Sequence, residues 1–116
     1  MRFNTALLHS AKLGDENTGA TLTPIYQSSA FYQPSAEQHE KLFHNKATGY
    51  SYTRINNPTI AAFEERMTNL EKGVGSVACS SGMAALTNAL LNIVGTGGEI
   101  VSSTGLYGGT IDLFHD

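Results

Sequence analysis

A corner of small residues at positions 80–83, Ser-Ser-Gly-Met, is the first part of the sequence whose residue types suit a chemical task. A helix that begins at such a turn presents unpaired backbone N–H groups at the positive end of its dipole. These groups form a binding site for an anion, and phosphate is the usual ligand. The alternative is an ordinary serine cap followed by a glycine that permits the turn, and this short pattern taken alone favours that alternative.

A tyrosine and an arginine two residues apart, Tyr52 and Arg54, form the second candidate site. In an extended segment, residues two apart share a face, so we expect the two side chains to point the same way. A phenol beside a guanidinium can bind an oxyanion, and the guanidinium can hold phosphate through two hydrogen bonds. A surface arginine beside a packing tyrosine is the alternative.

The third candidate is Tyr107, which two glycines follow. Because the glycines carry no side chains, a planar ligand has room to stack on the ring. A loop tyrosine that packs on its own domain is the alternative. Cys79 is interpreted as a small buried hydrophobic residue rather than a nucleophile. No metal site is predicted, because metal-ligand spacing is absent among the histidines, which are His9, His39, His44 and His115.

The elements that must position these residues lie mainly after residue 50. Asn57 is expected to cap a helix that has Pro58 as its first residue and that Gly73 closes. A second helix is predicted over about 83–94, and a third after the segment 107–110. Short strands are predicted over 76–79 and 99–102. Helices that alternate with strands indicate an α/β fold with a mostly parallel sheet, of which the chain would hold only the first part.

Residues 1–50 have a different, largely irregular pattern. They include a strand-like run at 25–32 and a helical pattern over 35–43, with Ser35 as its cap and Gln38 at the capping-box position. This segment has too little apolar surface for a core of its own. We therefore expect an N-terminal arm over 1–50 that lies on another domain or subunit, and the beginning of the α/β domain over 51–116.

Composition restricts the classes of function. The 116 residues are 41% hydrophobic and 15% charged, which is typical of a soluble globular protein. A net charge of −3 disfavours a nucleic-acid partner. No apolar stretch is long enough to span a membrane, and no secretory leader is recognisable. With a single cysteine, the expected location is the cytoplasm.

Five spaced motifs, taken together, resemble the N-terminal part of the Cys/Met-metabolism family of pyridoxal-phosphate (PLP) enzymes. They are Asp-Glu-Asn-Thr-Gly-Ala at 15–20, Pro-Ile-Tyr-Gln-Ser-Ser-Ala-Phe at 24–31, Tyr-Thr-Arg-Ile-Asn-Asn-Pro-Thr at 52–59, Ser-Ser-Gly-Met-Ala-Ala at 80–85 and Leu-Tyr-Gly-Gly-Thr at 106–110. The resemblance implies a type I PLP-dependent transferase fold, similar to that of aspartate aminotransferase. Within the family, the motif at 52–59 is most similar to that of O-acetylhomoserine sulfhydrylases, with methionine γ-lyases and cystathionine γ-synthases or lyases as the alternatives.

The resemblance also assigns roles to individual residues. Gly82 and Met83 would give backbone N–H groups to the PLP phosphate, and Tyr107 would stack on the pyridine ring and assist proton transfer. Tyr52 and Arg54 would bind the phosphate of a neighbouring subunit's cofactor. The family's cofactor-binding lysine has no counterpart in the chain, and the chain alone is therefore expected to be inactive.

The implied reaction of the complete enzyme is the replacement of acetate on O-acetylhomoserine by sulfide or a thiol. The products, homocysteine or methionine, belong to methionine biosynthesis and cysteine metabolism. A cytoplasmic homotetramer is expected, with small-molecule substrates and no nucleic-acid or membrane partner. A non-catalytic, truncated interaction module is the alternative of another class.

Overall fold

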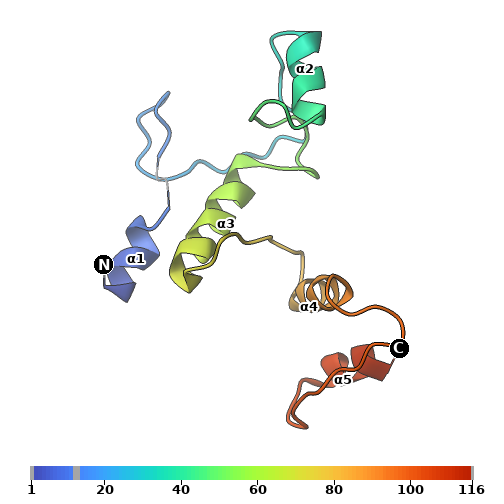
Figure 1. The fold of residues 1–116 in the computed structure, drawn as a ribbon. Coiled ribbons are helices and arrows are strands. Elements are labelled where there is room, and N and C mark those ends of the chain that lie inside the picture. Colours follow the sequence, from blue (N-terminus) through green and yellow to red (C-terminus); the bar gives the residue numbers. More distant parts are fainter. Residues whose placement is uncertain (1, 12–13, 116) are drawn as a thin grey trace. The chain divides into compact units, whose positions relative to one another are not determined.

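A computed structural model describes residues 2–11 and 14–115, and the helices and loops of this part of the chain are shown in Figure 1. The chain divides into two compact units, Met1–Val77 and Ala78–Asp116. The first unit holds α1 (Phe3–His9), α2 (Ala36–Phe43) and α3 (Pro58–Glu71). The second holds α4 (Gly82–Leu91) and α5 (Gly108–His115). The predicted division at residue 50, between an N-terminal arm and the beginning of an α/β domain, stays a prediction.

Helix α3 begins as the sequence predicts. The Asn57 side chain accepts a hydrogen bond from the Thr59 backbone N–H at 2.8 Å, and Pro58 occupies the first helical position. The end of the helix differs from the prediction, because Lys72 and not Gly73 takes the left-handed conformation, with φ of 55°. The Gly73 N–H reaches back to the Thr68 carbonyl oxygen at 2.9 Å, and this closing bond requires the reversal one residue earlier.

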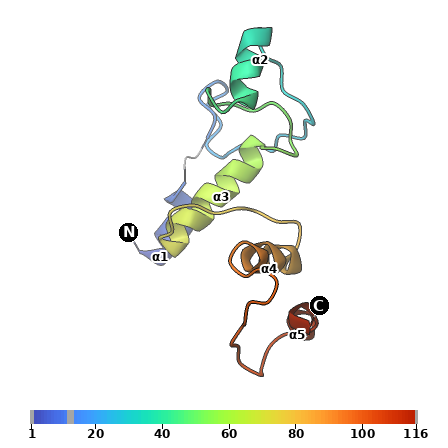
Figure 2. The same ribbon diagram turned by 45° about the vertical axis from the view of Figure 1, so that its right-hand side comes forward.

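Both remaining helices of the first unit lie within the predicted arm. Ser35 caps α2 by accepting from the Gln38 N–H at 3.2 Å, which confirms the predicted helix and its cap. Helix α1 was not predicted, and no side-chain cap marks its beginning at Arg2. It contacts α3, beside which it lies in Figure 2. The arm is therefore more regular than the sequence pattern indicates.

The second unit also differs from the prediction at its helix ends. Ser81 caps α4 by accepting from the Ala84 N–H at 3.1 Å, and the helix ends at Leu91, three residues earlier than predicted. Helix α5 begins at Gly108, so the two glycines lie in its first turn and not before it. The reason is the Tyr107 carbonyl oxygen, which accepts from the N–H groups of Thr110 and Ile111 at 2.9 and 3.3 Å.

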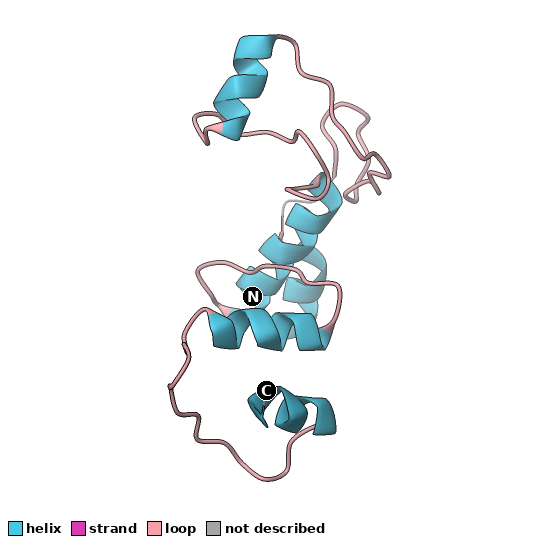
Figure 3. Ribbon diagram, turned by 90° about the vertical axis from the view of Figure 1, so that its right-hand side faces the viewer, coloured by secondary structure: helices cyan, strands magenta, loops and turns pink. Residues whose placement is uncertain are grey.

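No strand ladder forms within residues 2–11 and 14–115, and Figure 3 shows helices and loops there. Pairing is limited to two isolated antiparallel bridges, Asp15 with Ala20 and Ala30 with Tyr52. The segments 76–79 and 99–102, predicted as strands, are not helical but lack a partner strand. A strand needs such a partner for its backbone N–H and C=O groups. The mostly parallel sheet is therefore not observed in the described part of the chain.

Burial is slight throughout the described residues. No hydrophobic side chain there is buried, and the buried polar residues are Asn57 and Thr110, with 3% and 6% exposure. Val77 and Val101, in the two predicted strands, are exposed. The hydrogen-bonded surroundings of Asn57 thus form the best-enclosed part of the first unit.

Candidate functional site

Tyr52 and Arg54 lie together, as the sequence predicts. The Arg54 guanidinium carbon is 5.1 Å from the centre of the Tyr52 ring, which is a cation–π distance. The local geometry differs from the extended segment that was expected. The Tyr52 carbonyl oxygen accepts from the N–H groups of Ile55 and Asn56 at 2.9 and 3.1 Å, so the pair lies on a turn. Within the described residues, Arg54 makes no ion pair, and its charge is available to an anion.

The turn that carries this pair is fastened to the segment 28–31. The Thr53 backbone N–H donates to the Ser29 carbonyl oxygen at 2.9 Å, and the Phe31 N–H donates to the Ser51 carbonyl oxygen at 3.0 Å. The Thr53 hydroxyl donates to the Ser28 carbonyl oxygen. Backbone and side chain of Thr53 therefore both hold the turn against a segment that is more than twenty residues away in sequence.

Asn57 is the residue whose importance the sequence analysis missed. Besides capping α3, its side-chain N–H₂ group donates to the Tyr26 carbonyl oxygen and to the Thr53 hydroxyl oxygen, each at 3.0 Å. Thr59 completes the link, since its hydroxyl accepts from the Tyr26 N–H at 2.9 Å and donates to the Pro24 carbonyl oxygen at 3.1 Å. The signal available in the sequence was the choice of asparagine, because a serine cap would lack the two donors.

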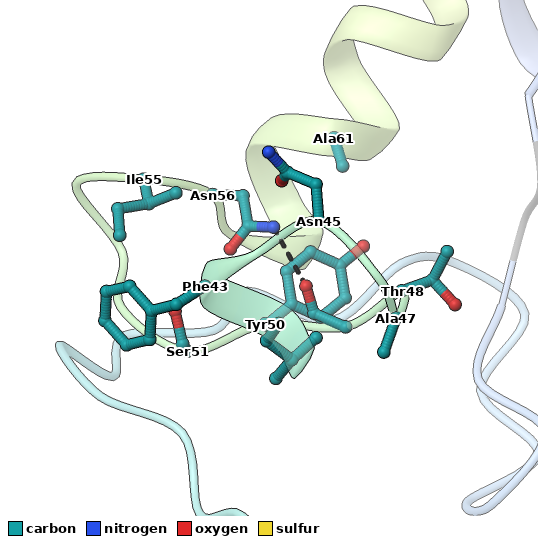
Figure 4. Close-up of a pocket in the computed structure, with 11 residues that line it drawn as sticks. Phe43, Asn45, Ala47, Thr48, Tyr50, Ser51, Ile55, Asn56 and Ala61 are labelled. Carbon is teal, nitrogen blue, oxygen red and sulfur yellow. Dashed lines mark hydrogen bonds between the residues drawn. The ribbon is translucent and has the colours of Figure 1, made fainter. Parts of the chain in front are cut away.

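An open pocket of about 710 Å³ lies next to the turn, between α2, the loop 44–51 and the first turn of α3 (Figure 4). Its lining contains no charged side chain; it consists of Leu42, Phe43, Asn45, Ala47, Thr48, Gly49, Tyr50, Ser51, Ile55, Asn56 and Ala61. The Asn56 side chain donates to the Gly49 carbonyl oxygen at 2.9 Å and so joins the loop to the turn. The pocket is therefore suited to uncharged groups, whereas the neighbouring Arg54 is suited to an anion.

The beginning of α4 has the features of an anion site. The Ser81 hydroxyl satisfies the Ala84 N–H, whereas the N–H groups of Gly82 and Met83 belong to the first helical turn, which has no acceptors within the helix. A methyl group placed on Gly82 would have no atom within 4 Å. The side-chain position of Gly82 is therefore open.

The structure brings Tyr107 close to this helix beginning. Helices α4 and α5 are in contact. A Cβ atom built on Gly109 would lie 2.8 Å from the Tyr107 ring and 3.5 Å from the Met83 sulfur. The Tyr107 side chain is 73% exposed, so its ring is accessible to a ligand. The second unit thus joins Tyr107 and Met83, while Tyr52 and Arg54 are joined in the first.

Other chemistry-bearing residues form no further site in the described part of the chain. Cys79 is half-buried rather than fully buried, and the Asn88 side chain donates to its sulfur at 3.6 Å. No group of three or more His, Cys, Asp and Glu residues could hold a metal ion among the described residues. Over the same residues, the structure contains no helix of the length and apolar character needed to cross a membrane.

One carboxyl group has a lowered pKa. The pKa of Asp15 lies below its ordinary value of 3.8, chiefly because the Asn17 backbone N–H and then the Thr18 hydroxyl donate to the carboxylate. These bonds close the loop 15–20, which the pairing of Asp15 with Ala20 holds at its base. The carboxylate thus organises this loop of the arm, and its partners among the described residues are Asn17 and Thr18.

Comparison with known proteins identifies the family. Residues 4–116 match the family described as Cys/Met metabolism PLP-dependent enzyme. The chain is 48% identical over 112 residues to O-acetyl-L-homoserine sulfhydrylase of Corynebacterium glutamicum, covering 97% of this chain and 26% of that protein. It is 44% identical to cystathionine gamma-lyase of Bacillus subtilis, covering 95% and 27%. The chain thus spans about a quarter of the length of these relatives.

A solved structure has a similar fold. The crystal structure described as an O-acetylhomoserine (thiol)-lyase of Campylobacter jejuni is similar with a TM-score of 0.88 and 32% identity. The match covers 98% of this chain and 28% of that one, which carries a pyridoxyl-lysine phosphate.

Proposed function

Since the chain belongs to the Cys/Met metabolism family of PLP-dependent enzymes, we propose that it forms the N-terminal part of an O-acetylhomoserine sulfhydrylase. The complete enzyme would replace the acetate on the γ-carbon of O-acetylhomoserine by sulfide or a thiol, giving homocysteine or methionine. The similarity to the sulfhydrylase of Corynebacterium glutamicum supports this reaction. The observation that carries the proposal is the proximity of the Tyr107 ring and the Met83 sulfur, both of which lie beside Gly109.

The described residues fit pyridoxal phosphate. The N–H groups of Gly82 and Met83 lie in the first turn of α4, the part of a helix that binds phosphate, and the space at the side-chain position of Gly82 is open. Arg54 supplies a positive charge with no carboxylate partner within the described residues, and Tyr107 offers an accessible ring. The N–H groups and the guanidinium are thus suited to the phosphate of the ligand, and the Tyr107 ring is suited to its pyridine ring.

Bound pyridoxal phosphate supplies an electron sink that labilises bonds of the amino-acid substrate. The residues of this chain would perform the binding and orientation. Gly82 and Met83 would bind the phosphate through their N–H groups, and Tyr52 and Arg54 would bind the phosphate of a neighbouring subunit's cofactor. The Tyr107 ring would stack on the pyridine ring, and its hydroxyl would hold or pass a proton at the substrate. The lysine that anchors the cofactor is supplied elsewhere in the enzyme, so the 116-residue chain alone is inactive.

The finer features of the assembly belong to the same proposal. Tyr52 and Arg54 would reach the cofactor of a neighbouring subunit in a homotetramer, because they follow an arm that has no buried hydrophobic side chain among its described residues. The exposed Val77 and Val101 would lie in a mostly parallel sheet completed by other parts of the enzyme. The enzyme would act in the cytoplasm.

The test is an assay of the complete enzyme with O-acetylhomoserine plus sulfide, with cystathionine and with methionine. With O-acetylhomoserine and sulfide, we expect homocysteine at a rate at least tenfold above the rates of cystathionine or methionine cleavage. Faster release of an α-keto acid from cystathionine or from methionine would identify a γ-lyase instead, a candidate that the similarity to cystathionine gamma-lyase supports. Lack of turnover with all substrates, in protein that binds the cofactor, would refute both assignments.

A further inference from the structure

Asn57 connects three separate parts of the first unit. Its Oδ1 accepts from the Thr59 N–H at the beginning of α3, and its Nδ2 donates to the Tyr26 carbonyl oxygen and to the Thr53 hydroxyl. With 3% exposure, it is less exposed than Thr110, the other buried residue of the described part of the chain. Because both donors and the acceptor are used, the carboxamide has one orientation only.

The link to Thr53 is the important one, because Thr53 lies between Tyr52 and Arg54. The Thr53 hydroxyl donates its single proton to the Ser28 carbonyl oxygen, so it serves Asn57 as an acceptor. The Thr53 side chain is therefore held from two sides. Rotation of the turn about this residue would break both bonds and would carry the two neighbouring side chains with it.

We propose that Asn57 is a positioning residue that acts through Thr53 to hold Arg54 ready for a phosphate. The inference rests on the proposed function, since the phosphate is that of the PLP cofactor. Arg54 itself has no ion pair within the described residues, and its guanidinium lies over the Tyr52 ring. Without the Asn57 bonds, an exposed arginine would lose many conformations on binding the anion, which weakens the complex.

Asparagine alone among the small polar residues meets these requirements. Aspartate retains the oxygen that caps α3 but has no donor for Tyr26 or Thr53, and serine is too short to reach both. Asn57→Asp therefore separates the capping role from the positioning role. Thr53→Val is a second variant, which removes the bond to Asn57 together with the hydroxyl's bond to the Ser28 carbonyl oxygen, adds no charge and leaves the cap in place.

The test measures the affinity of the complete apoenzyme for pyridoxal phosphate and for pyridoxal, which lacks the phosphate. Asn57→Asp and Thr53→Val should each weaken the binding of pyridoxal phosphate by about tenfold, a typical coupling between groups in contact. The binding of pyridoxal should change by less than twofold. In an Arg54→Ala background, neither substitution should weaken pyridoxal phosphate further, because the group through which they act is gone.

Asn69→Asp is the matched control on the same helix. Its side chain also donates to a backbone carbonyl oxygen of the N-terminal segment, that of Ser10, at the opposite end of α3. This variant should lower stability and leave the affinity for pyridoxal phosphate unchanged. Equal losses for pyridoxal and pyridoxal phosphate, or additive losses with Arg54→Ala, would overturn the positioning role. If Arg54→Ala itself leaves the affinity unchanged, the phosphate-binding role of Arg54 is wrong instead.

Discussion

Substitution of Gly82 by alanine should change stability and cofactor affinity in opposite directions. A methyl group at this position meets no atom within 4 Å, and the φ angle of Gly82 is not in the left-handed region, so the folded chain can accept it. Alanine loses less conformational entropy than glycine in a helix, and the gain is up to about 0.5–1 kcal/mol. The apoenzyme should therefore melt at the same temperature or higher.

The cofactor should bind more weakly to this variant. Cα–Cβ bonds in a helix tilt toward its N-terminus, so the added methyl group would enter the space in front of the free N–H groups. A hydrogen bond to a charged group contributes about 1.5–3 kcal/mol, and displacement of one such bond corresponds to roughly 10- to 100-fold in affinity. Titration of the apoenzyme with pyridoxal phosphate measures this loss.

Gly95→Ala provides the control. A methyl group on Gly95 also has no atom within 4 Å, but this residue lies beyond the end of α4. Its substitution should leave the cofactor affinity unchanged. A Gly82→Ala apoenzyme with unaltered stability and unaltered affinity would show that the phosphate does not bind at this helix end, and the assignment of Gly82 and Met83 would fall.

Three further predictions follow from the same structure. Arg54→Ala should weaken cofactor binding roughly tenfold to hundredfold. Co-expression of this variant with one that lacks the cofactor-binding lysine should restore part of the activity in mixed oligomers. If these mixed oligomers are inactive while mixed oligomers of wild type and the lysine variant are active, Arg54 acts in its own subunit's site. Gly109→Ala should displace the Tyr107 ring, from which its Cβ would be only 2.8 Å away, and slow turnover, whereas Gly108→Ala meets no atom within 4 Å and should have little effect; equal rates for the two variants would contradict the contact. Because the pKa of Asp15 is lowered, the hydrogen bonds of its carboxylate stabilise the loop 15–20 at a pH above 3.8. These bonds are lost as the pH falls through the lower folded-state pKa. A carboxyl NMR titration with a midpoint at or above 3.8 would refute this.

Local chemistry made the beginnings of three helices predictable from the sequence. Ser35, Asn57 and Ser81 each accept from an N–H group two or three residues ahead, which depends only on neighbouring residues. Helix α1 lacks such a cap and depends on its contact with α3, so the sequence pattern missed it. The sequence analysis assigned the end of α3 to Gly73, because glycine is the residue type that favours a left-handed conformation. The left-handed residue is instead Lys72, because the Gly73 N–H donates to the Thr68 carbonyl oxygen.

Contacts between distant residues were less predictable. The proximity of Tyr52 and Arg54 was predicted correctly from their spacing, although the structure achieves it with a turn rather than a strand. The proximity of Tyr107 to Met83 depends on the packing of α5 against α4, which no local pattern gives. The roles of these residues in binding a cofactor stay predictions, as does the sheet, whose pairing partners do not occur among the described residues.

The lack of a buried hydrophobic side chain among the described residues has a consequence for biosynthesis. In an enzyme of the relatives' length, these residues leave the ribosome first, and about three quarters of the chain follows. At about 5–20 residues per second, apolar side chains such as Ile25 and Val101 stay in contact with water for tens of seconds before partners exist. Chaperones that bind nascent chains would recognise them in this interval. A ribosome that stops in this part of the message would release a product that aggregates or is degraded, so the cellular amount of the enzyme would depend on uninterrupted translation.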